Sequence, residues 1–184
     1  MNLSNLDSKQ LNVLDQFKRG KNIFMTGPAG TGKSYLIKII KKCCETMGKK
    51  YQVTALTGCA SLLLNCNAKT LHSWSGIGIG NGDLDLILRR IRRKKGVSKR
   101  WKNIDVLIID EVSMMSKKLF EILDYVAKEI RRDLDPFGGI QLIFSGDFYQ
   151  LPPVGNSETD EGKFCFESNL WEMAFPSIIE LNKI

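Results

Sequence analysis

The sequence predicts an α/β domain in which a mostly parallel β-sheet is flanked by helices. Short apolar segments typical of buried strands alternate along the chain with amphipathic segments of helical period. The first strand-like segment runs directly into a glycine-rich loop and a helix, and a later one ends in two adjacent acids, Asp110 and Glu111. With 184 residues, 43% of them apolar, the chain suits a single domain over residues 1–184.

The elements of the N-terminal half follow from the spacing of apolar residues. Residues 6–17 repeat apolar side chains at helical period, with Ser8 as the expected cap. Residues 22–26 (NIFMT) and 51–56 (YQVTAL) are short apolar runs typical of buried strands. Between them, residues 33–44 (KSYLIKIIKKCC) are expected to form a helix. A small-residue turn after the second strand, TGCAS, leads into a further short helix.

The C-terminal half continues the alternation. Residues 104–109 (IDVLII) are apolar enough for a central strand of a parallel sheet. Residues 116–132 form a clearly amphipathic helix with basic side chains near its C-terminal end. A glycine-rich turn precedes a strand over residues 140–145, and the predicted elements end with a helix over 170–174 and a strand over 178–181.

Residues 27–34 fit the phosphate-loop pattern G-x-x-x-x-G-K-[ST] at every fixed position. In such a loop the backbone N–H groups and the following helix N-terminus face a polyphosphate. Lys33 is expected on the β- and γ-phosphates and Ser34 on Mg²⁺. A glycine-rich turn that binds nothing is the alternative, and the lysine, the serine and the preceding strand disfavour it. The loop, which predicts binding of ATP and Mg²⁺, consists of Gly27, Pro28, Ala29, Gly30, Thr31, Gly32, Lys33 and Ser34.

Two further strand ends carry side chains suited to nucleotide chemistry. Asp110 is expected to hold Mg²⁺, and Glu111 to position and deprotonate an attacking water. Gln150 follows the strand over 140–145 and is expected at the same sheet edge, near a γ-phosphate. Acids end strands by chance in many proteins, but their place downstream of a phosphate loop favours catalysis.

Composition excludes several classes. The sequence has no run of about 18 apolar residues and no N-terminal apolar stretch typical of a secretory signal. Its five cysteines show no C-x-x-C pairing, and the single histidine argues against a zinc site. We therefore expect an intracellular protein with no membrane contact and with free, mostly buried thiols.

Positive charge and polar turns are compatible with nucleic-acid binding but do not distinguish it from an ordinary solvated surface. The net charge is +7, and a dense basic run lies between Arg89 and Lys102, beginning within a helix expected over 84–95. Such a run either binds phosphates or is solvated surface. Thr57 and Gly58 suit backbone phosphates, and His72 with Trp74 suits base stacking. A well-capped helix and a buried Trp beside a satisfied His explain the same residues equally well.

Taken together, the motifs GPAGTGKS, LIIDEVSMM and FSGDFYQLPPV resemble, in order and spacing, those of the petite-integration-frequency (PIF-type) family of superfamily 1B 5′-to-3′ DNA helicases. The resemblance covers Gln10 to Leu181. It implies a RecA-like fold and a monomeric motor that acts on single-stranded DNA in genome maintenance. Phosphate-loop kinases lack the GDFYQLPP segment, which also disfavours a DNA-binding module that uses ATP only as a switch.

The resemblance implies a role for each matching residue. Gln10 matches the adenine-reading glutamine, and Gln150 the γ-phosphate sensor. Lys33, Ser34, Asp110 and Glu111 match the phosphate, metal and water-activating residues. Single-stranded DNA contacts are implied for Thr57, Gly58, His72 and Ser73, with Cys59-Ala60-Ser61 a departure from the family's pattern.

Helicases of this family use two RecA-like domains, and the second supplies arginines to the γ-phosphate. The present sequence reaches Ile184, where the family's next arginine-containing motif begins. We therefore expect this chain to be the first motor domain, which binds nucleotide but does not unwind DNA by itself.

Overall fold

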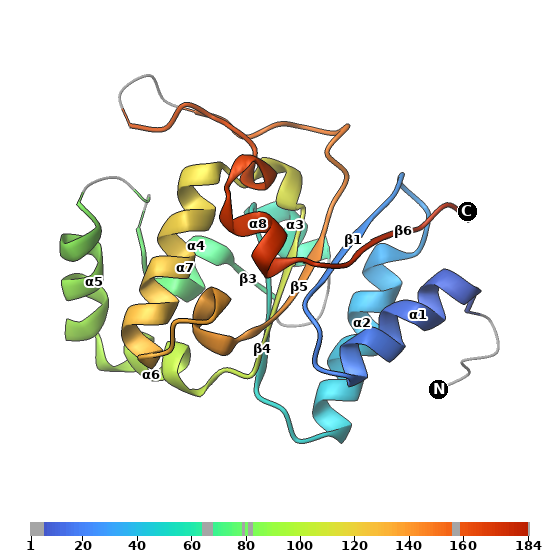
Figure 1. Cartoon of the computed structure of the whole chain (residues 1–184), viewed down its shortest axis with the longest axis horizontal. Coiled ribbons are helices and arrows are strands. Elements are labelled where there is room, and N and C mark those ends of the chain that lie inside the picture. The colour runs from blue at the N-terminus through green and yellow to red at the C-terminus, as the bar shows by residue number, and fades with distance from the viewer. Residues whose placement is uncertain (1–5, 64–67, 79, 81–82, 156–158, 184) are drawn as a thin grey trace.

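The computed structural model describes residues 6–63, 68–78, 80, 83–155 and 159–183. Its strands form one parallel sheet in the order β3-β2-β4-β5-β1-β6 (Figure 1). The strands are β1 (Ile23–Thr26), β2 (Tyr51–Ala55), β3 (Lys69–Thr70), β4 (Val106–Asp110), β5 (Gln141–Ser145) and β6 (Ile178–Glu180). The α-helices are α1 (Ser8–Lys18), α2 (Lys33–Thr46), α3 (Gly58–Leu63), α4 (Leu71–Ser75), α5 (Leu84–Arg93), α6 (Lys95–Asn103), α7 (Lys117–Arg131) and α8 (Leu170–Ala174). The predicted α/β class and parallel sheet are confirmed.

The sheet separates two hydrophobic cores. In β4, Val106 and Ile108 join the core formed with α1 and α2, whereas Leu107 and Ile109 join the core beneath α4 to α8. Figure 1 shows α1 and α2 on one side of the sheet and α7 on the other. Because successive strand residues face opposite sides, a strand covered on both faces must be apolar throughout. This explains why residues 106–109 are apolar without interruption.

Helix α1 is capped by Asp7 rather than by Ser8. The Asp7 carboxylate accepts a hydrogen bond from the Gln10 backbone N–H at 2.8 Å, and Gln10 Oε1 accepts one from the Asp7 N–H at 3.2 Å. This reciprocal pair is a capping box, which needs a Gln or Glu three residues after the cap. The predicted cap was wrong by one residue because Gln10 selects Asp7 as its partner.

Two segments differ from their predicted structure. The basic helix ends at Arg93, because Lys94 leaves the helical conformation (φ −87°, ψ 86°), and α6 then begins. Residues 69–75, to which the sequence analysis assigned neither a strand nor a helix, form β3 and α4. Trp74 is 2% exposed and packs against Trp101 with ring centroids 4.6 Å apart. Base stacking by Trp74 was therefore the wrong alternative, and the buried reading is confirmed.

The described cysteines are free. Cys44 and Cys165 are buried, Cys43 is half-buried and Cys59 is exposed, while Cys66 lies outside the described residues. Burial raises the pKa of the Cys165 thiol to about 12, so this group stays protonated and inert. Across the described ranges, no helix is long and apolar enough to cross a membrane. The same part of the chain contains no cluster of three or more His, Cys, Asp or Glu side chains placed to hold a metal ion.

Candidate nucleotide site and adjoining groove

The strand order brings the predicted site residues to one edge of the sheet. β5 lies between β1 and β4, with Met25 opposite Ser145 and Ile109 opposite Phe144. Because all three strands are parallel, their carboxyl ends meet at the same edge. The phosphate loop follows β1, the two acids end β4, and residues 146–150 follow β5. The predicted common edge is thus observed.

The phosphate loop adopts a conformation that requires glycine. Gly27 has φ +136°, and a Cβ atom placed on it would lie 2.2 Å from the carbonyl oxygen of Leu181. Gly32 has φ +89° and immediately precedes α2. Side-chain-bearing residues are strained at such angles. The loop therefore positions the N-terminus of the 14-residue helix α2, with its unpaired N–H groups, at the sheet edge.

Lys33 folds back into the loop. Its ammonium group donates hydrogen bonds to the carbonyl oxygens of Gly27 at 2.5 Å and of Pro28 at 3.0 Å. The Thr31 hydroxyl donates to the Pro28 carbonyl at 2.8 Å and so holds the loop closed. Ser34 lies exposed in the first turn of α2. A cation and free helix N–H groups together form a site suited to phosphate oxygens.

The two acids occupy an environment that favours their protonated forms. Asp110 is 6% exposed, and burial raises the pKa of its carboxyl, an effect that the Ser145 hydroxyl, the Glu111 backbone and the Lys33 charge oppose. For Glu111, burial and the neighbouring Asp110 raise the pKa, Lys33 lowers it, and Asp147 raises it. A raised carboxyl pKa suits a group that must accept a proton from water.

Glu111 also has an unusual backbone. Its φ of 58° and ψ of 41° place it in the left-handed region, which non-glycine residues seldom occupy. Conformations of this kind cost about 1–3 kcal/mol and persist only where the surrounding structure imposes them. The turn directs the chain from β4 into the 3₁₀ helix η2 (Val112–Met114), so the acid sits at the turn itself.

A buried hydroxyl beside Asp110 fits a hydrated cation. Ser145 is fully buried at the end of β5, and its Oγ has no well-formed hydrogen bond among the described residues. Mg²⁺ binds oxygen ligands and keeps several waters, so the predicted ligands Ser34 and Asp110 would suffice for such an ion beside a nucleotide. The Ser145 hydroxyl would then lie where it could bond to a water of that ion. Ser145 was not predicted as a site residue. Its position as a hydroxyl-bearing residue at the end of an apolar strand could have pointed to it.

Gln150 is linked to the acids through Asp147. Its Nε2 donates to Asp147 Oδ2 at 3.3 Å, and its backbone N–H donates to the Asp147 carbonyl at 2.9 Å. Asp147 is also among the charges that raise the pKa of Glu111. Gln150 itself is exposed at the sheet edge, where a phosphate sensor was predicted. Asp147 was not predicted, because its link to Glu111 depends on the pairing of β5 with β4.

Gln10 lies against the phosphate loop, as its proposed contact with adenine requires. Its Nε2 donates to the Thr31 carbonyl at 3.2 Å, while its Oε1 closes the capping box of α1. A Cβ atom on Gly32 would lie 2.7 Å from this amide nitrogen. The side chain is therefore held at the loop from two directions, and its adenine-reading role stays a prediction.

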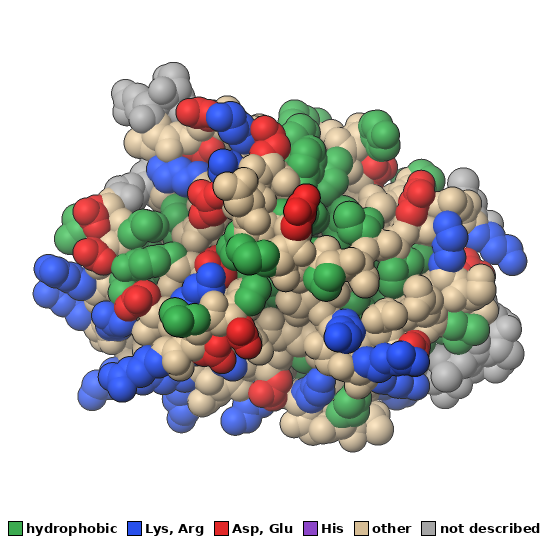
Figure 2. Space-filling model, in the orientation of Figure 1, with side chains coloured by type: hydrophobic (Ala, Val, Ile, Leu, Met, Phe, Trp, Pro, Cys, Tyr) green, Lys and Arg blue, Asp and Glu red, His purple; other side chains and the backbone are tan. Residues whose placement is uncertain are grey.

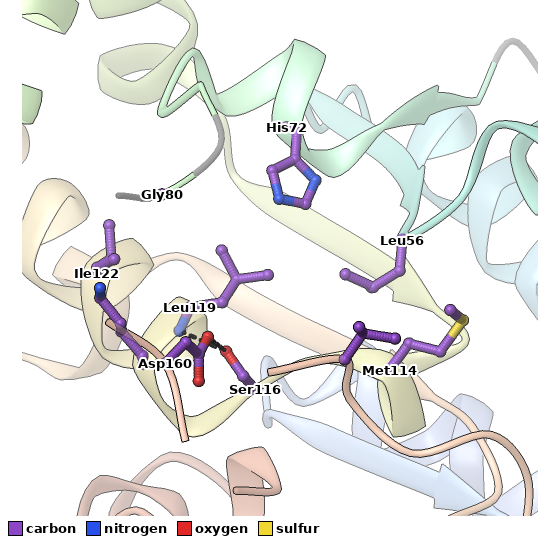
Figure 3. A pocket seen from close by; sticks show the side chains of 10 residues that line it. Leu56, His72, Gly80, Met114, Ser116, Leu119, Ile122 and Asp160 are labelled. Atoms are coloured by element: carbon purple, nitrogen blue, oxygen red, sulfur yellow. Dashed lines mark hydrogen bonds between the residues drawn. The ribbon is translucent and has the colours of Figure 1, made fainter. Parts of the chain in front are cut away.

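One of the predicted DNA contacts, His72, lines a groove (Figure 3). The groove has a volume of about 240 Å³, and His72 on α4 faces Leu56, the residue after β2, across it. On the opposite wall, Ser116 Oγ donates to Asp160 Oδ2 at 2.5 Å. Burial lowers the pKa of His72, so its imidazole is neutral at physiological pH.

The remaining predicted DNA residues lie at the starts of α3 and α4. The Thr57 hydroxyl accepts a hydrogen bond from the Ala60 N–H at 3.2 Å, and Gly58 is exposed. Ser73 is exposed, and its N–H donates to the Thr70 hydroxyl at 3.3 Å. The helix-cap alternative for Thr57 is therefore observed, and it leaves the adjoining backbone open to a ligand.

Replacing Asp110 by asparagine should stabilise the chain without nucleotide and abolish its response to Mg²⁺. Because folding raises the pKa of this carboxyl, ionised Asp110 costs stability as pH rises from the unfolded pKa through the folded pKa, and below both values the cost disappears. We expect Asp110→Asn to raise the melting temperature by about 2–4 °C at neutral pH, equivalent to about 1 kcal/mol, and less in acid.

Thermal melts over a pH series, with and without MgATP, measure both effects. Asp124→Asn is a contrasting control, since Asp124 is also buried but forms an ion pair with Lys128 at 2.8 Å and accepts from the Phe137 N–H. Its replacement should lower the melting temperature. Equal destabilisation by both variants would contradict the account given for Asp110.

Comparison with known proteins finds sequence similarity to one family of helicases. The family model described as PIF1-like helicase matches residues 5–184. The chain is 43% identical over 181 residues to the ATP-dependent DNA helicase PIF1 of Saccharomyces cerevisiae, covering 97% of this chain and 21% of that protein.

Two crystal structures of Pif1 helicases share the fold. The enzyme from Candida albicans matches with a TM-score of 0.89 and 43% identity, over 97% of this chain and 40% of that one. The Bacteroides enzyme in complex with ADP-AlF3 and single-stranded DNA matches with a TM-score of 0.75 and 29% identity, over 97% and 42%. The chain thus spans about a fifth of its yeast relative and two fifths of the crystallised chains.

Proposed function

Because this chain belongs to the PIF1-like helicase family, we propose that it is the first RecA-like motor domain of an ATP-dependent DNA helicase that moves 5′-to-3′ on single-stranded DNA. The observation that carries the proposal is the convergence of Lys33, Asp110 and Glu111 on one sheet edge. These side chains supply a phosphate cation, a metal ligand and a base.

Each side chain has a defined task in hydrolysis. Lys33 turns from the loop carbonyls to the β- and γ-phosphate oxygens of ATP. Glu111 accepts a proton from the water whose oxygen attacks the γ-phosphorus, while the bond to the ADP oxygen breaks. Gln150 contacts the γ-phosphate. Its hydrogen bond to Asp147 links that contact to Glu111, so loss of the γ-phosphate alters the surroundings of the base. Ser34 and Asp110 would hold Mg²⁺, which would supply positive charge beside the phosphates.

We propose that single-stranded DNA contacts the carboxyl edge through Thr57, Gly58, His72 and Ser73. The neutral imidazole of His72 at the groove supports base contact, since an uncharged ring stacks without a desolvation cost for charge. The relative from Bacteroides was crystallised with both ADP-AlF3 and single-stranded DNA. A shared edge for nucleotide and DNA lets one influence the other.

A second RecA-like domain is proposed as the source of catalytic arginines. Among the described residues, Lys33 is the one basic group that shifts the pKa of Asp110 or Glu111. Catalytic arginines contribute about 10³–10⁵ in rate in related phosphoryl transfers. The relatives are also several times longer than this chain.

ATP turnover by this chain, with and without a single-stranded oligonucleotide, tests the proposal. We expect near-zero hydrolysis in both conditions, together with retained binding of a fluorescent ATP analogue and Mg²⁺. Robust DNA-stimulated turnover by these residues alone would contradict the need for a second domain. Phosphate transfer to a nucleoside with no response to DNA would instead indicate a kinase.

A further inference from the structure

Helix α6 presents a row of lysines on one side. Lys95, Lys99 and Lys102 recur at i, i+4 and i+7, a spacing that aligns them on one helix face, and all three are exposed. The opposite side of the helix packs inward through Val97 and the fully buried Trp101. The lysines are therefore fixed in position by a helix anchored in the core. We call these three lysines, with Arg93 and Lys94 at the α5–α6 junction, the basic face.

Within the described part of the chain, no carboxylate forms an ion pair with the basic face. Of the nine basic side chains between residues 89 and 102, Arg92 is the one with an ion pair among the described residues, to Glu129 at 3.1 Å. The nearby Asp105 carboxylate accepts a hydrogen bond from the Lys50 backbone N–H at 2.7 Å. Figure 2 shows Lys and Arg side chains gathered over α5 and α6 at the lower left of the molecule.

The basic face borders a pocket at the amino edge of the sheet. This pocket of about 320 Å³ lies between α6 and the starts of β2 and β4, and its lining includes Lys50, Lys99 and Arg100. The Arg100 Nε is buried without a hydrogen-bond partner. Among the described residues, no carboxylate forms an ion pair with this guanidinium group. Because ATP is expected at the carboxyl edge, these charges lie apart from the proposed nucleotide site.

We infer that the basic face is a second DNA-binding surface, which holds the sugar-phosphate backbone of a duplex. A duplex carries one negative charge per about 1.7 Å of axis, twice the density of one strand, so a row of lysines gains most from double-stranded DNA. Single-strand sites usually add exposed aromatic rings for stacking. On α5 and α6 the one aromatic side chain, Trp101, is fully buried. This inference rests on the proposal that the chain works on DNA.

Binding of a fluorescent duplex at increasing salt concentration tests the inference. The variant Lys95→Gln/Lys99→Gln removes two charges from the basic face. The matched control Lys38→Gln/Lys42→Gln removes two exposed lysines at the same i, i+4 spacing on α2. We expect the α6 variant to bind duplex more weakly and to reduce the slope of log K against log salt by about 2, or about 1 per lost phosphate contact. The control should match the wild type.

Several results would overturn the inference. These are an unchanged slope in the α6 variant, an equal loss in the α2 control, weakened binding of single strands alone, and no duplex binding by the wild type. In the last case an acidic protein segment becomes the expected partner. Binding of a fluorescent ATP analogue and of single-stranded DNA, measured on the same samples, separates this failure from that of the proposed function. If both persist, only the duplex surface is lost.

Discussion

Replacement of Lys33 by alanine should lower the affinity for MgATP by at least about 100-fold. The ammonium group is positioned by the Gly27 and Pro28 carbonyls at the mouth of the phosphate loop, and each charge-assisted hydrogen bond that it transfers to phosphate contributes about 1.5–3 kcal/mol. Two such bonds correspond to a 100-fold change or more. Titration with a fluorescent ATP analogue measures the loss.

Lys38→Ala is the matched control for this variant. Lys38 lies five residues further along α2 and is exposed, so its removal changes net charge and helix composition in the same way. We expect unaltered affinity in this control. Retained affinity in Lys33→Ala would refute the assignment of residues 27–34 as a phosphate loop. Melting curves without nucleotide show whether either variant has lost its fold.

Replacement of Glu111 by glutamine should reduce the rate of ATP hydrolysis by about 10²–10⁴-fold and leave ATP binding intact. Glutamine has the size of glutamate but accepts no proton from water, and it preserves the left-handed turn as well as glutamate does. The loss is measured in the longer protein that includes the second motor domain, as steady-state turnover with saturating single-stranded DNA.

The control here is Glu172→Gln, an exposed position on α8. It should hydrolyse ATP at the wild-type rate. Normal turnover in Glu111→Gln would show that another group activates the water, and Asp147, which acts on the pKa of Glu111, would be the first alternative. Lost binding in the same variant would instead point to a structural role.

Local sequence patterns predicted most elements because each depends on neighbouring residues. The strand at 140–145 and the helix at 170–174 have apolar spacing that identifies them without knowledge of the fold. Helix α6 was missed because Gly96 and the run of lysines hide its two inward residues, Val97 and Trp101. β3 has two residues, too few for any period to appear.

The links within the site were less predictable, because they depend on strand order. The motif residues Lys33, Asp110 and Glu111 could be assigned from the loop pattern and the acidic strand end. The roles of Ser145 and Asp147 can be inferred only when β5 is known to lie between β1 and β4. No periodicity in the sequence predicts that strand order, so the contacts of these two residues with the acids could be identified only from the structure.

The contact between Gly27 and Leu181 has a consequence for how the molecule folds. The Leu181 N–H donates to the Thr26 carbonyl at 2.8 Å, and its own carbonyl fills the space beside Gly27. Leu181 must therefore reach Thr26 and Gly27 before the first turn of the phosphate loop is stabilised. Contacts of such long sequence separation form slowly, because closing a long loop costs entropy. During synthesis, ATP binding competence should thus arise only after β6 has left the ribosome and joined the sheet.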